Sequence, residues 1–185
     1  MENPIAAIVI GSICGFLLMF WTIPSARAGR PHMVFVSFAL ATFLALAVLT
    51  IAGVWQPTSL AWLNFVGWVF QLLGVLLFAL SFQSLLTKGQ SSKEDKEPTV
   101  IVDSSVYRLT RHPMYAGIGI WAMGMTLCRP NPVSAIIAGV CAAFTLLAAV
   151  KEDTYNLKRF GEPYARYMKR VPLANVFRRH SQRGD

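Results

Sequence analysis

The chain has 185 residues, of which 55% are hydrophobic and only 14% are charged, and its formal net charge is +8 at pH 7. The length fits one domain, but so apolar a composition is unusual for a water-soluble domain and is typical of a membrane protein. The net positive charge alone could suggest a nucleic-acid partner. Its distribution along the chain indicates a membrane orientation instead, so we expect no nucleic-acid partner.

Five apolar segments predict five transmembrane helices, because about 18 apolar residues or more can cross the hydrocarbon core of a bilayer. Three segments are long enough and two are shorter: residues 5–23, 33–54 and 62–86, then 114–127 and 133–150. No basic residue precedes the first segment, so we expect a mature helix rather than a signal peptide. The prediction is an all-α, polytopic membrane protein in which residues 1–185 form a single integral membrane domain.

The basic residues predict how this bundle is oriented. Sixteen of the 17 Lys and Arg residues fall on one side of the five-helix arrangement, and Arg129 alone falls on the other. Because Lys and Arg are retained on the cytoplasmic side of membranes, we expect the N-terminus outside and the C-terminus in the cytoplasm. A basic cytoplasmic face also attracts anionic membrane lipids.

Two segments after the third predicted helix differ from the apolar sequence around them. Residues 88–98 (KGQSSKEDKEP) form a polar linker of mixed charge. A short β-branched run follows it, made of Thr99, Val100, Ile101 and Val102. This run favours an extended backbone, which can offer N–H and C=O groups to a ligand.

The last two predicted helices form a short hairpin. Residues 129–132 (RPNP) place two prolines in a tight, non-helical turn, and the helix before it has only about 14 residues, short for a full crossing. Antiparallel neighbours joined by a short turn have their other ends close together. Five polar side chains therefore converge at the cytoplasmic interface: Arg111, His112, Tyr115, Glu152 and Asp153.

The helix that carries Glu152 continues into polar sequence. Glu152, Tyr155, Asn156 and Arg159 share one helix face, and we expect the helix to stop at Phe160, before Gly161. A second short helix opens at Pro163 and has an apolar stripe, made of Tyr164, Tyr167, Met168 and Val171. We predict that it lies as an amphipathic helix on the cytoplasmic membrane surface.

The three cysteines indicate packing rather than chemistry. Cys14, Cys128 and Cys141 lie in or beside apolar segments and lack the spacing of metal ligands. We therefore expect neither disulfides nor a metal site.

Each polar residue at the interface also has an ordinary explanation. Arg111 suits an anchor in lipid headgroups, Tyr115 an aromatic belt, and Glu152 a solvated helix end. Together they favour a site, because the chain has only nine carboxylates and residues 104–151 contain none.

Three stretches carry a resemblance to a known family: residues 111–117 (RHPMYAG), the Glu152–Asp153 pair and residues 160–172 (FGEPYARYMKRVP). Together they resemble the signature of the superfamily of isoprenylcysteine carboxyl methyltransferases and phospholipid methyltransferases. The resemblance covers about half of the chain, residues 80–175.

The resemblance implies an integral membrane methyltransferase that binds S-adenosylmethionine in a pocket facing the cytosol, closed by the C-terminal segment. It divides the chain into a three-helix scaffold, residues 1–86, and a cofactor-binding catalytic part, residues 87–185. The residues at the matching cofactor-binding positions are Thr99, Val100, Ile101, Val102, Tyr107, Arg111, His112, Pro113, Met114, Tyr115 and Glu152.

The chemistry of this cofactor suits such a set. It carries a carboxylate, an ammonium, a sulfonium and a ribose diol, so its pocket needs both signs of charge. Arg111 or His112 suits the carboxylate, and Glu152 suits the ammonium or the ribose hydroxyls. Methyl transfer disperses charge, so positioning worth up to ~7–11 kcal/mol can supply much of the rate without a general base. The catalytic residues therefore stay unassigned.

The acceptor is less well specified than the cofactor. Members of the superfamily that methylate carboxylates place an Arg about one turn before the acidic Glu, where this chain has Ala148 and Ala149. The resemblance thus predicts a lipophilic acceptor and leaves phospholipid amines, isoprenoid carboxylates and small thiols open. A non-catalytic lipid-binding or transporter-auxiliary protein is the alternative from another class.

Overall fold

The computed structural model describes residues 11–12, 15–16, 20, 22–25, 27–89 and 100–173. Most of the predicted first helix, residues 5–23, lies outside these ranges. Cys14, Thr99 and residues 90–98 of the polar linker also lie outside them.

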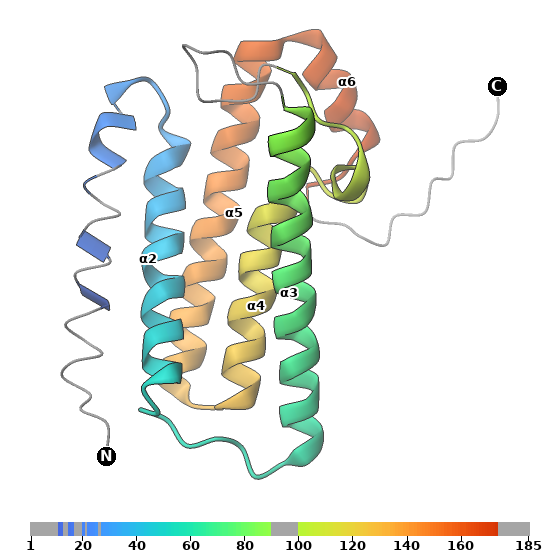
Figure 1. Ribbon diagram of the computed structural model, residues 1–185. Helices are drawn as coiled ribbons and strands as arrows, with labels where there is room; N and C mark the ends of the chain where they lie inside the picture. The colour runs from blue at the N-terminus through green and yellow to red at the C-terminus, as the bar shows by residue number, and fades with distance from the viewer. Residues whose placement is uncertain are drawn as a thin grey trace.

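Within the described ranges the protein is all-helical, as predicted. In chain order the helices are α2 (His32–Ile51), α3 (Ala61–Lys88), the 3₁₀ helix η1 (Ser105–Arg108), α4 (Pro113–Cys128), α5 (Pro132–Phe160) and α6 (Glu162–Arg170). Figure 1 shows α2, α3, α4 and α5 running side by side as a bundle, with α6 at one end of it.

Three of the described helices, α2, α3 and α5, are long and apolar enough to cross a membrane. The outer surface of α3 illustrates this, because Trp62, Phe65 and Trp68 are each more than 60% exposed. Such a continuous apolar surface is unfavourable in water and suits contact with lipid. α4 has 16 residues, fewer than the roughly 20 that a perpendicular crossing requires.

The helix pairing adds a detail that the sequence did not predict. α4 packs most extensively against α3, and α5 packs most extensively against α2. The α3–α4 contact is close because glycines meet there: a Cβ placed on Gly74 would lie 2.7 Å from the backbone oxygen of Gly117. Small residues at a helix crossing let two backbones approach in this way.

The residues at its two ends explain where α5 begins and where it stops. Asn131 precedes α5, and its side chain accepts a hydrogen bond from the Val133 N–H at 2.9 Å. Pro132 then occupies the first turn, where its missing N–H leaves no bond unmade. The helix ends at Phe160, as predicted, and Gly161 follows with φ of 60°.

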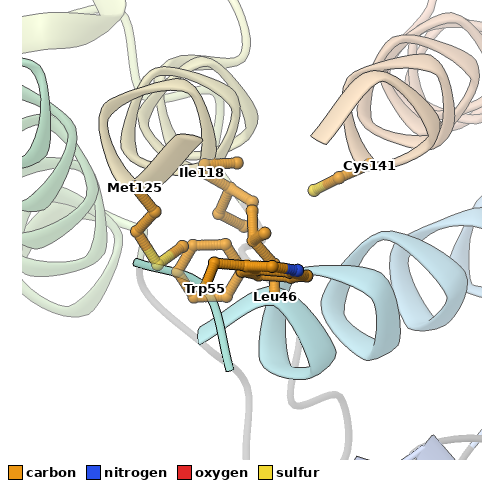
Figure 2. Close-up of a cluster of buried hydrophobic side chains, with 7 residues drawn as sticks. Leu46, Trp55, Ile118, Met125 and Cys141 are labelled. Atoms are coloured by element: carbon orange, nitrogen blue, oxygen red, sulfur yellow. The ribbon is translucent and has the colours of Figure 1, made fainter. Parts of the chain in front are cut away.

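A buried apolar cluster closes the bundle near the α2–α3 connection. Figure 2 shows Leu46, Trp55, Ile118, Met125 and Cys141 gathered between the helices. Arg129, the one basic residue predicted outside, donates from Nη1 to the Trp55 carbonyl oxygen at 2.7 Å. Cys128 and Cys141 are both buried and unbonded to another sulfur, consistent with the predicted packing role.

Candidate functional site

A cavity of about 260 Å³ lies at the opposite end of the bundle. There α2 begins, α3 and α5 end, and α6 follows α5 (Figure 1). Its walls come from α2, α3, α4, α5 and α6, from η1 and from residues 100–102, which lie outside any helix. The cavity is therefore lined by residues from both predicted parts of the chain, the scaffold (residues 1–86) and the catalytic part (residues 87–185).

Most of the predicted site residues line this cavity. They are Val100, Ile101, Val102, Tyr107, Arg111, His112, Met114, Tyr115 and Glu152. Pro113 is fully buried as the first residue of α4, so it shapes the helix start without forming part of the wall. Thr99 lies outside the described residues.

A charged network holds the motif in place. The Asp153 carboxylate accepts from Arg111 Nη2 at 2.9 Å and from His112 Nε2 at 2.8 Å. Because an ionised carboxylate only accepts hydrogen bonds, Nε2 of His112 carries a hydrogen. The His112 side chain is 6% exposed and the Asp153 side chain 9%, so the network is shielded from water. Its charges are consequently screened far less than those of a surface ion pair.

Glu152 forms the other half of the acidic pair and faces the cavity. Its Oε2 atom accepts from the Tyr115 hydroxyl at 2.5 Å and lies 3.7 Å from His112 Nδ1. The His112 and Tyr115 rings stack with centroids 5.5 Å apart and an interplanar angle of 8°. Both signs of charge thus meet at one wall of the cavity, held at fixed positions.

Helix α6 forms part of the cavity wall through two tyrosines. The Tyr164 hydroxyl donates to Asp153 Oδ1 at 2.7 Å, and the Tyr167 hydroxyl donates to the Tyr107 carbonyl oxygen at 2.8 Å. Burial, and then the hydrogen bond to Asp153, raise the pKa of Tyr164 far above its usual value. Burial likewise raises the pKa of Tyr167, so both phenols remain protonated donors.

The apolar stripe of α6 is covered by protein. Tyr164, Tyr167 and Val171 are each less than 8% exposed and pack together with Ile101 and Phe160. The prediction that this stripe lies on the membrane surface is therefore wrong. The periodicity correctly indicated an apolar face, but protein side chains cover that face instead of lipid.

The residues after α6 are hydrogen-bonded to Thr110 and Arg111, at the start of the RHPMYAG motif. The Thr110 hydroxyl donates to the Leu173 carbonyl oxygen at 2.6 Å, and the Arg111 backbone N–H donates to the Pro172 carbonyl oxygen at 3.2 Å. Arg111 also donates from Nη1 to the Met168 carbonyl oxygen at 3.0 Å. Arg111 consequently contacts both the Asp153 carboxylate and the C-terminal segment that contains α6.

Sequence reasoning missed a second group of cavity residues. The additional residues that line the cavity are His32, Met33, Leu85, Tyr155, Asn156, Arg159, Phe160, Tyr164 and Tyr167. A sequence feature could have found Tyr155, Asn156 and Arg159, since they share a helix face with Glu152. Nothing in the sequence connects His32 with this cavity, because the two meet only through the packing of α2 on α5.

Ala148 and Ala149 lie one turn before the acidic pair and are 0% and 3% exposed. Neither lines the cavity. Among the residues that the structure describes, no cluster of three or more His, Cys, Asp or Glu side chains is placed to hold a metal ion.

Comparison with known proteins places these residues in a family. The profile of the phospholipid methyltransferase family matches residues 62–163, more than half of the chain. The chain belongs to the phospholipid methyltransferase family. With three helices long and apolar enough to cross a membrane, this member of the family is an integral membrane protein.

Individual relatives carry a more specific name. The protein-S-isoprenylcysteine O-methyltransferase of Schizosaccharomyces pombe is 32% identical over 121 residues, which cover 60% of this chain and 51% of the relative. Protein-S-isoprenylcysteine O-methyltransferase B of Arabidopsis thaliana is 30% identical, covering 63% of this chain and 60% of the relative. The human protein-S-isoprenylcysteine O-methyltransferase is 28% identical, covering 69% and 47%.

The chain thus spans about half the length of the curated relatives that it matches. No solved structure shows a significant match to it.

Proposed function

We propose that this protein is an S-adenosylmethionine-dependent methyltransferase that acts on a lipophilic acceptor at the cytoplasmic face of a membrane. One observation carries the proposal. The Glu152 carboxylate, Tyr115 and the paired cation Arg111 line one cavity, and they belong to the stretches that resemble the methyltransferase signature. The family membership and the names of the relatives support the same reaction class.

The cavity residues suit the cofactor. Glu152 presents a carboxylate that can accept from an ammonium or from ribose hydroxyls, and Arg111 and His112 can meet a carboxylate. Residues 100–102 line the wall as non-helical backbone, whose N–H and C=O groups suit the polar edge of an adenine or a ribose. Val100, Ile101, Val102, Tyr107, Met114 and Tyr115 supply the remaining contacts, and Thr99 and Pro113 belong to the same proposed set.

When bound, S-adenosylmethionine supplies a methyl group on a positively charged sulfur, which an acceptor atom attacks in line. The residues of this chain then have three tasks: they bind, they orient and they exclude water. The network around Asp153 keeps His112 in one orientation. Tyr164 and Tyr167 hold α6 over the cavity, so solvent is kept from the reacting atoms. Positioning of this kind is worth up to ~7–11 kcal/mol and requires no general base.

The acceptor is a membrane amphiphile that resembles either an isoprenylcysteine carboxylate or a phospholipid. The names of the relatives favour the first, and the family description favours the second. Such a molecule can enter sideways from the bilayer while the cofactor enters from the cytosol. Membrane lipids are therefore the surrounding medium and the source of the substrate.

The proposed topology has five transmembrane helices. Residues 1–86 form the scaffold with three of them, and residues 87–185 form the catalytic part with a helical hairpin of α4 and α5. The N-terminus lies outside, while the active site and the C-terminus are cytoplasmic, because the basic residues concentrate on that side. Cysteine-labelling from either side of sealed vesicles tests this orientation at positions 57 and 158.

Calorimetry with S-adenosylhomocysteine in detergent tests cofactor binding. We expect binding to the wild-type protein and its loss in Glu152→Ala and His112→Ala. Lys158→Ala is the matched control, since Lys158 is exposed near the same end of α5 and does not line the cavity. Absence of binding, or binding that survives both cavity substitutions, favours a non-catalytic lipid-binding or transporter-auxiliary protein.

Identification of the acceptor requires a second experiment. The purified protein is incubated with labelled S-adenosylmethionine and membrane lipid extracts, and the products are examined by mass spectrometry. We expect a methylated amphiphile that is absent with Glu152→Ala. Methylation that is equal in the variant contradicts the proposed site.

A further inference from the structure

A second pocket shares two residues with the cavity and has a different character. Its volume is about 690 Å³, and it is more open to the outside than the cavity. We name it the basic pocket and define it by six of the residues that line it: Ile101, Asp103, Arg166, Tyr167, Lys169 and Arg170. Ile101 and Tyr167 also line the cavity, so the two hollows are neighbours, but none of the four charged residues does. The basic pocket is therefore a feature separate from the proposed cofactor site.

The basic residues lie on the face of α6 that protein does not cover. Arg166, Lys169 and Arg170 are exposed, whereas Tyr164 and Tyr167 are buried. Arg166 and Arg170 are one helical turn apart, a spacing that separates their Cβ atoms by roughly 5–6 Å. Two guanidinium groups at this spacing reach the oxygens of one phosphate, and the planar guanidinium matches the geometry of such an oxyanion.

The charges of the basic pocket do not balance. Three cations line it, together with the Asp103 carboxylate. Asp103 lies 3.4 Å from Arg170, and the two side chains are 54% and 61% exposed. An ion pair as exposed as this is weak, so Arg170 is free to turn to another anion. The surplus of positive charge favours an anionic ligand.

The end of α3 places the basic pocket at the edge of the bilayer. The apolar surface of α3 continues into its last turn, where Leu86 is 70% exposed. Lys88, the last residue of α3, donates from Nζ to the Ser104 hydroxyl at 2.8 Å, and Val102 belongs to an apolar cluster that packs against α3. Asp103 thus lies between two residues that contact the end of α3. The pocket is therefore level with the end of the lipid-facing surface, where the headgroups lie.

We propose that the basic pocket binds the phosphate group of an anionic phospholipid. Such a lipid presents its phosphate at this depth, and each Lys or Arg near an anionic membrane surface adds to the attraction. Arg166 and Arg170 hold the phosphate oxygens, Lys169 adds a third positive charge, and the acyl chains extend into the bilayer. The apolar stripe of α6 stays covered by protein, so α6 contacts the headgroup of the lipid and not its hydrocarbon.

The test uses the full chain in detergent and two phospholipids with identical acyl chains, phosphatidylglycerol and phosphatidylcholine. Both carry a phosphate, but only phosphatidylglycerol has a net negative charge. Native mass spectrometry measures how much of each lipid stays bound when the two are offered at equal concentration. We expect the wild-type protein to prefer phosphatidylglycerol by about tenfold or more, because each basic residue contributes about fivefold in affinity.

Two substitutions with opposite effects locate the site. Arg166→Gln combined with Arg170→Gln removes two cations and brings the preference to within about twofold of none. Asp103→Asn removes the carboxylate and raises the affinity for phosphatidylglycerol by about fivefold, since the change in charge is of the same size. A variant that only damaged the fold would not bind the lipid more tightly. Lys158→Gln is the matched control, because Lys158 is an exposed cation of α5 that lines neither pocket, and it leaves the preference unchanged.

Four outcomes overturn the inference. The first is a wild-type protein that retains both lipids equally, and the second is a double arginine variant that keeps the preference. The third is a Lys158→Gln variant that loses as much as the double variant, which would make the overall charge of the chain the cause. The fourth is displacement of phosphatidylglycerol by an equal concentration of glycerol 3-phosphate, which would indicate a soluble phosphate ligand. None of these measurements involves S-adenosylhomocysteine, so this inference and the proposed function stand or fall separately.

Discussion

The Nε2 atom of His112 and the Oδ1 atom of Asp153 lie 2.8 Å apart, although 41 positions separate the two residues in the chain. The same carboxylate accepts from Arg111 and from the Tyr164 hydroxyl. One side chain of α5 thus joins the segment before α4 to the helix that covers the cavity. The position of the whole motif depends on it.

Asp153→Asn should lower both the stability and the cofactor affinity. The substitution keeps the shape of the side chain but leaves Arg111 buried without its counter-charge, and breaking a buried pair in this way costs about 3–5 kcal/mol. Thermal unfolding in detergent and calorimetry with S-adenosylhomocysteine measure the two effects. Asp103→Asn is the control, because Asp103 pairs with Arg170 at 3.4 Å while both are more than half exposed. That exposed pair is worth less than about 1 kcal/mol, so equal losses in the two variants would contradict the prediction.

Gly117→Ala should destabilise the α3–α4 contact. A Cβ at Gly117 would lie 2.8 Å from the Gly74 carbonyl oxygen and 2.9 Å from the Phe78 backbone nitrogen, so one helix must move. Overpacking of this kind costs about 1–3 kcal/mol. Gly119→Ala, two residues along the same helix, meets nothing within 4 Å and should be neutral or slightly stabilising. Unfolding temperatures that fall by the same amount in both variants would show that the close approach is unimportant.

Thr110→Val should speed the release of S-adenosylhomocysteine. It removes the hydroxyl that donates to the Leu173 carbonyl oxygen, with little change of shape. One such hydrogen bond is worth about 0.5–1.5 kcal/mol, or about a twofold to tenfold faster dissociation if it must break for release. Stopped-flow displacement measures the rate. Thr154→Val is the matched control, since the exposed Thr154 hydroxyl donates only to Val150 of its own helix. An unchanged rate in Thr110→Val would mean that release does not require this segment to detach.

Tyr107, Tyr164 and Tyr167 should resist ionisation in the folded protein. Burial raises the pKa of each phenol above its usual value, and the charge of Glu152 adds to this at Tyr107. Because their folded-state pKa values exceed the unfolded ones, the stability linked to them is full below about pH 10 and is lost as the pH rises further. Near-ultraviolet absorbance of tyrosinate should therefore show these three phenols protonated at about pH 11 until the protein unfolds. Titration of all five tyrosines together near pH 10 would contradict the burial of this cluster.

The sequence predicted the polar side of the cavity well. Arg111, His112 and Glu152 could be brought together because a short turn joins α4 to α5, and because carboxylates are so scarce in this chain that the pair at 152–153 stands out. The extension of α5 to Phe160 could also be predicted, since a helical polar face and a glycine mark its end.

Other features depend on how the helices pack, which the periodicity of the sequence does not predict. The stripe on α6 indicated an apolar face, but whether protein or lipid covers such a face is decided by which elements meet there. His32 reaches the cavity only because α2 packs along α5 over much of its length (Figure 1). The glycines at 67 and 74 match those at 117 and 124 in spacing, yet spacing does not say which two helices pair.

Arg111 binds the Asp153 carboxylate with one end of its guanidinium and the Met168 carbonyl oxygen with the other. Closure of the C-terminal segment and order in the charged network are therefore not independent equilibria. A ligand that binds better to the ordered network therefore also favours closure of the C-terminal segment. Closure in turn raises the affinity for that ligand by the same free energy. Through Arg111, ligand binding and closure of the C-terminal segment stabilise each other. Ligand binding can therefore be measured either as an affinity or as the stability that it adds to the closed C-terminal segment.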